Sequence, residues 1–182
     1  MSIREILIYP HETLLQIAKP VEDPTADEIK TLIQDMAETM YDAPGVGLAA
    51  PQIGVSLRVA VTDTDWRSGR YEDADEGKEV EPQKNLQVWI NPEFLWRSDT
   101  MTSHEEGCLS VPEIYENVER PDAVRLRWYD LEGVQHEKDF DGFEAVALQH
   151  EFDHLDGKLF VDHLSPLKRK MIRKKMLKRY HV

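Results

Sequence analysis

The stretch His150-Glu151-Phe152-Asp153-His154 fits the pattern H-E-x-x-H, with two imidazoles four residues apart and a carboxylate between them. On a helix, residues at this spacing lie on the same face, so both imidazoles can reach one metal ion. Asp141 followed by Glu144 predicts a capping box at the start of that helix, and Gly157 predicts its end. The same face would carry three apolar residues, Phe143, Val146 and Ala147. The stretch therefore predicts a helical metal site, with two surface histidines that bind nothing as the alternative.

Two histidines leave a catalytic metal site one protein ligand short, because such sites usually hold three ligands and water. One class of zinc peptidases takes the third ligand from a downstream glutamate, but residues 155–182 contain no Glu. Another class needs histidine at position 160, where this chain has Phe160, and His163 is out of register. The only cysteine, Cys108, follows Gly107 and is a candidate. Taken alone, a single cysteine is more often a small buried apolar residue.

Three blocks of sequence occur in an order that resembles the peptide deformylases, which remove the formyl group from N-formylmethionine on new polypeptides. They are G-V-G-L-A-A-P-Q at 45–52, E-G-C-L-S at 106–110 and Q-H-E-F-D-H-L at 149–155. The opening of the chain near Ile8, Tyr9, Pro10 and Leu14 is also similar to that family, as is the segment 159–167.

The resemblance implies a site built around one divalent metal ion. Its ligands would be Cys108, His150 and His154. The expected ion is Fe²⁺, with Zn²⁺, Ni²⁺ or Co²⁺ as substitutes. Glu151 would be the general base and then the general acid.

The resemblance also implies groups that contact the substrate. The side-chain amide of Gln52 and the backbone N–H of Leu109 would stabilise the oxyanion, while Gly47 keeps its segment close. Four residues are candidates for a methionine pocket, although they may equally be ordinary core: Val46, Phe143, Val146 and Ala147. Two positions depart from the pattern of similar family members. Tyr115 stands where some have an arginine that touches the peptide backbone, and His104 where a hydrophobic residue helps to line the methionine pocket.

Length, composition and charge limit the other properties of the protein. We expect 182 residues to form a single catalytic domain, 1–182. No apolar run is long enough to span a membrane, and the first residues resemble neither a signal nor a transit peptide. A single cysteine suits the cytoplasm, and the net charge of −13 argues against general affinity for DNA. These properties predict neither a membrane nor DNA as a partner, and the family resemblance implies N-formylmethionyl nascent peptides as the partners.

The charges are unevenly distributed along the chain. Residues 168–179 contain eight Lys or Arg and no acidic residue, on a predicted helix at 167–179. This basic C-terminal helix predicts a contact with the ribosome, with a solvated helix as the alternative. Residues 72–81 contain six carboxylates and predict an exposed loop between strands.

The remaining pattern predicts an α+β fold with antiparallel or mixed sheets around the H-E-x-x-H helix, plus N-terminal and C-terminal helices. Thr25 and Glu28 predict a capping box before a helix whose apolar stripe runs from Ile29 to Met40 and which ends before Pro44. Strands are expected at 58–64 and 86–91, and from Val124 to a turn at Gly133 and beyond.

Two further classes of function remain open at this point. One is a metallopeptidase, which the missing downstream ligand argues against. The other is a binding module stabilised by a metal, although a structural zinc site would normally have four protein ligands. Activity on formylated rather than free peptides would separate the deformylase from a metallopeptidase. Water in the fourth position of the metal would exclude the structural site.

Overall fold

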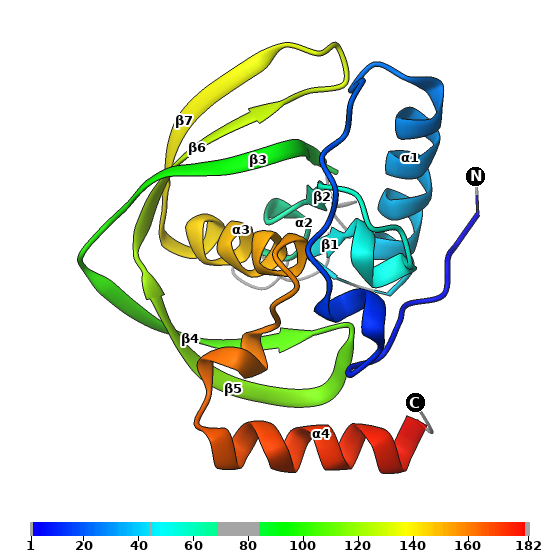
Figure 1. Ribbon diagram of the computed structural model, residues 1–182. Coiled ribbons are helices and arrows are strands. Elements are labelled where there is room, and N and C mark those ends of the chain that lie inside the picture. Colours follow the sequence, from blue (N-terminus) through cyan, green and yellow to red (C-terminus); the bar gives the residue numbers. More distant parts are fainter. Residues whose placement is uncertain (1, 44, 69–83, 181–182) are drawn as a thin grey trace, which may run out of the picture.

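The computed structural model describes residues 2–43, 45–68 and 84–180. Its centre is helix α3 (Gly142–Leu155), which lies between a five-stranded sheet and a two-stranded hairpin (Figure 1). The predicted α+β fold is confirmed, and the strands that pair within each sheet are all antiparallel. The acidic loop predicted at 72–81 lies outside the described residues.

The larger sheet has the order β1-β2-β3-β6-β7. Its strands are β1 (Gly47–Ala49), β2 (Val59–Thr62), β3 (Gln87–Arg97), β6 (Ala123–Tyr129) and β7 (Gln135–Asp141). The hairpin joins β4 (Met101–Cys108) to β5 (Val111–Pro121). The strands expected at 58–64 and 86–91 are present, but β3 continues to Arg97. The hairpin was not predicted, because its polar residues alternate with few apolar ones.

Helix α1 (Asp27–Asp42) packs its predicted apolar stripe into the core and ends before the glycine-rich segment. The capping box predicted for this helix is wrong, because its N-cap residue is Ala26 and no side chain caps it. The Thr25 hydroxyl instead donates to Asp23 Oδ1 at 2.7 Å, which holds the turn before the helix.

Helix α3 is buried on most of its surface, because the sheet covers one side and the hairpin another. Phe152 packs in the same cluster as Trp89 of β3, and Gly157 ends the helix with a positive φ of 70°. The predicted capping box is absent here too. Asp141 occupies the N-cap position, but its side chain makes no capping hydrogen bond. Asp141 is also the last residue of β7, in extended conformation, and Gly142 makes the turn into the helix with a φ of 57°.

Helix α4 (Pro166–Tyr180) lies against the hairpin, close to the range expected for the basic helix. Its buried residues Ile172 and Met176 pack in a cluster with Leu14, Val111 and Val118. The shorter elements are α2 (Asp65–Ser68) and the 3₁₀ turns η1 (Glu12–Leu15), η2 (Ala50–Ile53) and η3 (Phe160–His163). Within the described ranges, no helix has the length and apolar character needed to cross a bilayer.

Candidate metal centre

Three side chains from two elements meet at the end of the hairpin. Cys108 is the last residue of β4, while His150 and His154 are one turn apart on α3. Their candidate ligand atoms all lie within 4.8 Å of one another, and Cys108 Sγ is 3.3 Å from His154 Nε2. A thiolate and two imidazoles form a donor set that suits zinc or ferrous iron. The structure thus brings together the three residues predicted to bind metal.

The electrostatics of the three side chains fit a cation. Burial would raise the pKa of the Cys108 thiol, but the neighbouring His154 and His150 lower that pKa to about 5. A thiolate is the form of cysteine that binds metals. The adjacent Glu151 is buried, and its Oε2 atom has no hydrogen-bond partner in the described part of the chain. A metal ion and its water would satisfy both the thiolate and this carboxylate.

A chain of charged side chains contacts His150 at Nδ1 and runs from the buried Glu106 and Arg120 to the exposed His163. His150 Nδ1 lies 2.8 Å from Glu106 Oε2, which leaves Nε2 as the ligand atom. Arg120 donates to both carboxylate oxygens of Glu106, at 2.5 and 2.9 Å, and to Asp153 Oδ2 at 2.9 Å. Asp153 in turn lies 2.7 Å from His163 Nε2. Burial would raise the pKa of Glu106, but Arg120 and His150 lower it to about 2.

Sequence reasoning did not assign this supporting chain. Glu106 lies in the same block as Cys108, and a carboxylate two residues before a ligand on a strand could have suggested it. Nothing in the sequence indicated Arg120, because its partners are distant along the chain. Arg120 pairs with Thr102 and Glu106 with Glu116, so Arg120 and Glu106 share one face of the hairpin, and the long arginine side chain reaches along that face to the carboxylate.

Glu151 is held against the glycine-rich segment. A Cβ atom added at Gly47 would lie 2.3 Å from Glu151 Oε1 and 2.6 Å from its Cδ. Only glycine leaves room for the carboxylate at this position. Burial raises the pKa of Glu151 to about 7, although His150 and His154 lower it.

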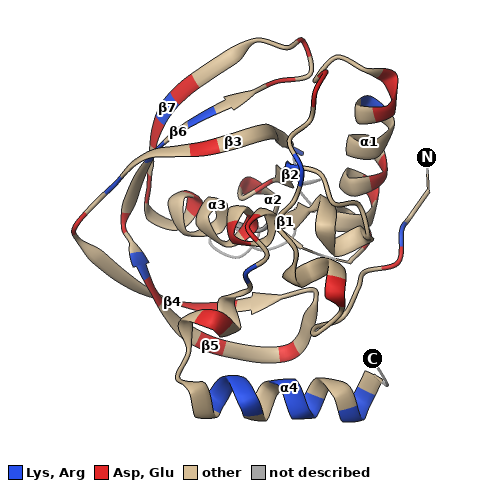
Figure 2. Ribbon diagram, in the orientation of Figure 1, with Lys and Arg blue, Asp and Glu red and all other residues tan. Residues whose placement is uncertain are grey.

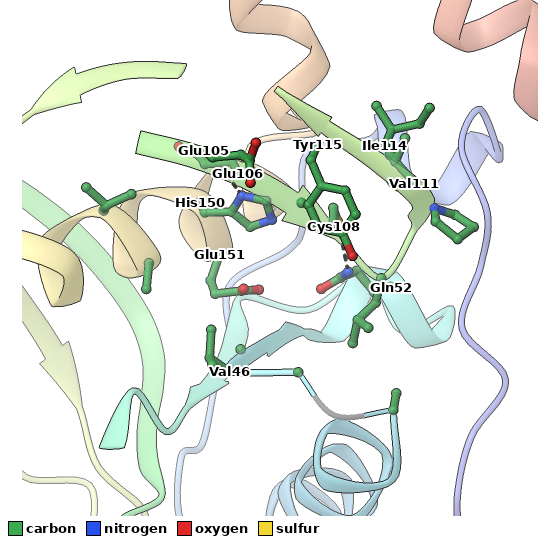
Figure 3. Close-up of a pocket in the computed structure, with 18 of the residues that line it drawn as sticks. Val46, Gln52, Glu105, Glu106, Cys108, Val111, Ile114, Tyr115, His150 and Glu151 are labelled. Atoms are coloured by element: carbon green, nitrogen blue, oxygen red, sulfur yellow. Dashed lines mark hydrogen bonds and ion pairs between the residues drawn. The ribbon is translucent and has the colours of Figure 1, made fainter. Parts of the chain in front are cut away.

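Gln52 has a fixed orientation beside the cysteine. Its Oε1 accepts a hydrogen bond from the backbone N–H of Ala49 at 2.8 Å. Its Nε2 donates to Ser110 Oγ at 3.1 Å and lies 3.5 Å from Cys108 Sγ. The side-chain N–H₂ group therefore faces the candidate metal centre. Figure 3 shows Gln52, Glu151 and Cys108 around the same cavity.

The cavity has a volume of about 640 Å³, and the predicted catalytic and substrate-binding residues all line it. Leu109 lies beside Cys108 at the end of the hairpin. The four candidates for an apolar pocket come from the glycine-rich segment and the start of α3: Val46, Phe143, Val146 and Ala147. Phe143 is half exposed, whereas Val146 and Ala147 are buried. Tyr115 also lines the cavity, but the partly buried His104 is absent from the described lining.

Comparisons with known proteins agree with this site. The family model described as polypeptide deformylase matches residues 3–170. A peptide deformylase from Phenylobacterium zucineum is 52% identical over 178 residues, covering 98% of this chain and 97% of that protein. The crystal structure of a peptide deformylase from Legionella pneumophila is 46% identical, with a TM-score of 0.83, and covers 99% of this chain and 96% of its own. That of the Ehrlichia chaffeensis enzyme in complex with actinonin is 32% identical, with a TM-score of 0.86 and full coverage of both chains. This chain therefore belongs to the polypeptide deformylase family.

Proposed function

We propose that this chain is a metal-dependent hydrolase that removes the formyl group from the N-terminal formylmethionine of newly synthesised polypeptides and releases formate. One observation carries the proposal. The Cys108, His150 and His154 side chains converge beside a buried glutamate, at a cavity that is lined in part by apolar side chains. One oxygen of this glutamate has no hydrogen-bond partner among the described residues. The family of the chain agrees with this chemistry.

The three converging side chains would hold one divalent ion, Fe²⁺ in the cell, with Zn²⁺, Ni²⁺ or Co²⁺ able to replace it. Such an ion supplies Lewis acidity toward the attacking water and the formyl oxygen. The hydrogen bond from His150 Nδ1 to Glu106 would fix the imidazole tautomer, so that Nε2 has its lone pair free for the ion.

Glu151 would move the proton. Its carboxylate takes a proton from the water as the water oxygen bonds to the formyl carbon. It then gives that proton to the amine nitrogen as the C–N bond breaks, so formate and a free methionyl amine leave. Gly47 contributes by having no side chain where the Glu151 carboxylate must lie.

Negative charge would develop on the former carbonyl oxygen during this attack. The N–H₂ group of Gln52, held by Ala49 and Ser110, and the backbone N–H of Leu109 are the proposed donors to that oxygen. The methionine side chain would enter among Val46, Phe143, Val146 and Ala147, whose apolar surface suits an unbranched thioether.

Glu151→Gln tests the proposed function directly. Removing a general base should lower kcat/KM by roughly 10²-fold or more on a formyl-Met peptide, while metal content stays normal. Glu144→Gln, on the same helix, is the matched control and should remain active. The enzyme should release formate from the formylated peptide and leave the same unformylated peptide intact. Cleavage of internal peptide bonds would favour a metallopeptidase instead. Loss of metal from the glutamine variant, with activity restored by added metal, would make Glu151 a ligand.

We also propose that α4 contacts the ribosome in the cytoplasm, where nascent substrates emerge. The helix carries its cations along the side of the molecule below the hairpin (Figure 2). Three of them pair with acidic residues of the same chain: Lys168 with Glu116, Arg169 with Asp162, and Arg179 with Glu113. Five others are exposed and have no acidic partner in the described part of the chain: Lys170, Arg173, Lys174, Lys175 and Lys178. These five are the cations available to RNA phosphates.

Deleting α4 would be a poor test, because Ile172 and Met176 are buried against the body and their loss would uncover the core. Changing Lys174, Lys175 and Lys178 to Gln leaves that packing intact. This triple variant should co-sediment less with ribosomes, most clearly at low salt, while hydrolysing a free formyl-Met peptide normally. Lys168→Gln is the control, because Lys168 is already paired. Unchanged co-sedimentation of the triple variant would refute the contact.

A further inference from the structure

The wall of the cavity that faces the hairpin is the short segment between α1 and β1, continued by the first residue of β1. Four of its residues line the cavity: Ala43, Gly45, Val46 and Gly47. Figure 3 shows Val46 below Glu151, across the cavity from Tyr115. Gly47 pairs with Thr62 in the larger sheet, whereas Val46 directly precedes β1 and is outside this pairing. The position of Val46 therefore depends on contacts other than the sheet register.

Asp63, the residue after β2, contacts Val46 from the side away from the cavity. Its backbone N–H donates to the Val46 carbonyl at 2.8 Å. The Asp63 side chain is fully buried, and three uncharged groups donate to its carboxylate. The Tyr41 hydroxyl and the backbone N–H of Asn85 donate to Oδ2, at 2.6 and 2.8 Å, and the backbone N–H of Trp66 donates to Oδ1 at 2.9 Å. One buried carboxylate thus joins α1, α2 and the segment that leads into β3.

Tyr41 is fixed as the side-chain donor of this group. It lies in the last turn of α1, and burial together with the negative charge of Asp63 raises its pKa, so the hydroxyl keeps its proton. Its ring packs edge-on against Trp66, with ring centroids 4.8 Å apart. A buried charge is costly unless its hydrogen bonds are complete, so these donors hold Asp63 in one position. Through its backbone N–H, Asp63 passes that constraint to Val46.

We propose that Asp63 and Tyr41 are positioning residues that fix Val46 and thereby set the width of the proposed methionine pocket. This inference rests on the proposed deformylase function. If the carboxylate loses its donors, the Val46 carbonyl loses a fixed partner, and the apolar side chain on the cavity wall can shift. Glu151 should be affected less, because Gly47, against which its carboxylate lies, stays paired with Thr62.

Two nearly isosteric substitutions test this role. In Asp63→Asn the amide NH₂ group would face a backbone N–H whichever way the side chain is turned, so the contact with Trp66 or with Asn85 is lost. Tyr41→Phe keeps the ring and removes one donor. KM for a formyl-Met peptide should rise roughly 5- to 20-fold in Asp63→Asn and less in Tyr41→Phe, with kcat within about threefold of normal.

The selectivity for methionine separates positioning from general destabilisation. The ratio of kcat/KM for a formyl-Met peptide to that for the matching formyl-Ala peptide should fall in both variants, because only the longer side chain reaches the wall at Val46. Combining the two substitutions should lower the ratio no further than Asp63→Asn does alone, since both act through one contact. Assays are run on variants of equal metal content, well below their melting temperatures.

Tyr129→Phe is the matched control. It removes a hydroxyl that donates to Gln135 at 3.1 Å on an exposed part of the larger sheet, and it should leave the ratio unchanged. If Asp63→Asn does not fold, Tyr41→Phe still decides the question. An unchanged ratio in folded Tyr41→Phe, a loss confined to kcat, or an equal change in Tyr129→Phe would overturn the proposal. Failure of the deformylase function would be recognised separately, because the unaltered protein would then release formate from neither peptide.

Discussion

Gly47→Ala should disable the enzyme through Glu151 without touching a proposed metal ligand. The added methyl group would lie 2.3 Å from Glu151 Oε1, 2.6 Å from Cδ and 2.8 Å from Cγ. Ordinary contact between such atoms is about 3.5 Å, so the carboxylate has to retreat by about 1 Å. Gly47 does not need a positive φ, so the effect comes from the space that the methyl group takes and not from backbone strain.

A misplacement of this size at a reacting group can lower the rate by about 10²-fold. We therefore expect kcat/KM of Gly47→Ala on a formyl-Met peptide to approach that of Glu151→Gln, while both variants bind metal normally. Formate release and metal analysis of the same preparation measure the two quantities. Because the two substitutions disable the same group, combining them should cost little further activity.

Stability gives an independent readout of the same clash. Crowding a packed site costs about 1–3 kcal/mol, so Gly47→Ala should lower the melting temperature. In a Glu151→Ala background the clashing atoms are gone, and the added methyl group should then cost much less. Gly45→Ala is the control, since its Cβ would approach the flexible end of Leu109 at 2.9 Å. A Gly47→Ala enzyme within twofold of the normal rate would refute this reasoning.

Two further predictions concern the metal centre and its support. Cys108→Ser should bind metal more weakly and melt at a lower temperature, as measured by metal analysis and thermal unfolding, because a hydroxyl is a poorer ligand than a thiolate; unchanged values would make Cys108 an ordinary core residue. Arg120→Met should lower the free energy of unfolding by about 3–5 kcal/mol, because it leaves the carboxylates of Glu106 and Asp153 buried without their cation. It should also weaken metal binding by about 10- to 100-fold through His150, whereas Arg125→Met, at a half-exposed ion pair with Asp139, should do neither.

The sequence predicted those parts of the fold whose signals are local. The apolar stripe of α1, the H-E-x-x-H helix and the basic helix α4 each follow from residues within one segment. Both capping-box predictions were wrong, because each depends on a neighbouring residue or element that the capping-box pattern does not include. Thr25 is engaged by Asp23, and Asp141 is still part of a strand. Thr25 and Asp141 are residue types that can cap a helix, but their local surroundings determine which hydrogen bonds their side chains make.

The parts that sequence did not predict depend on pairing between distant segments. The hairpin has few apolar residues to mark it, since one of its faces is exposed and the other contains the buried pair Glu106 and Arg120. Charged residues on a strand usually indicate an exposed position, and only the pairing of β4 with β5 brings Glu106 and Arg120 to the same buried face. The candidate ligands were found because the family resemblance connected Cys108 to a motif far along the chain.

The buried charges explain how two remote elements can present one metal site. Cys108 comes from the hairpin and both histidines come from α3, so the site requires these elements to keep a fixed relative position. Arg120 provides that link, because its guanidinium binds Glu106 on the hairpin and Asp153 on α3 at the same time. Burying an ion pair is seldom favourable in itself, and apolar residues of similar volume are often at least as stable. The arrangement instead makes the orientation of His150 depend on the same contacts that hold the hairpin against the helix, so the candidate ligands from the two elements share one set of supporting contacts.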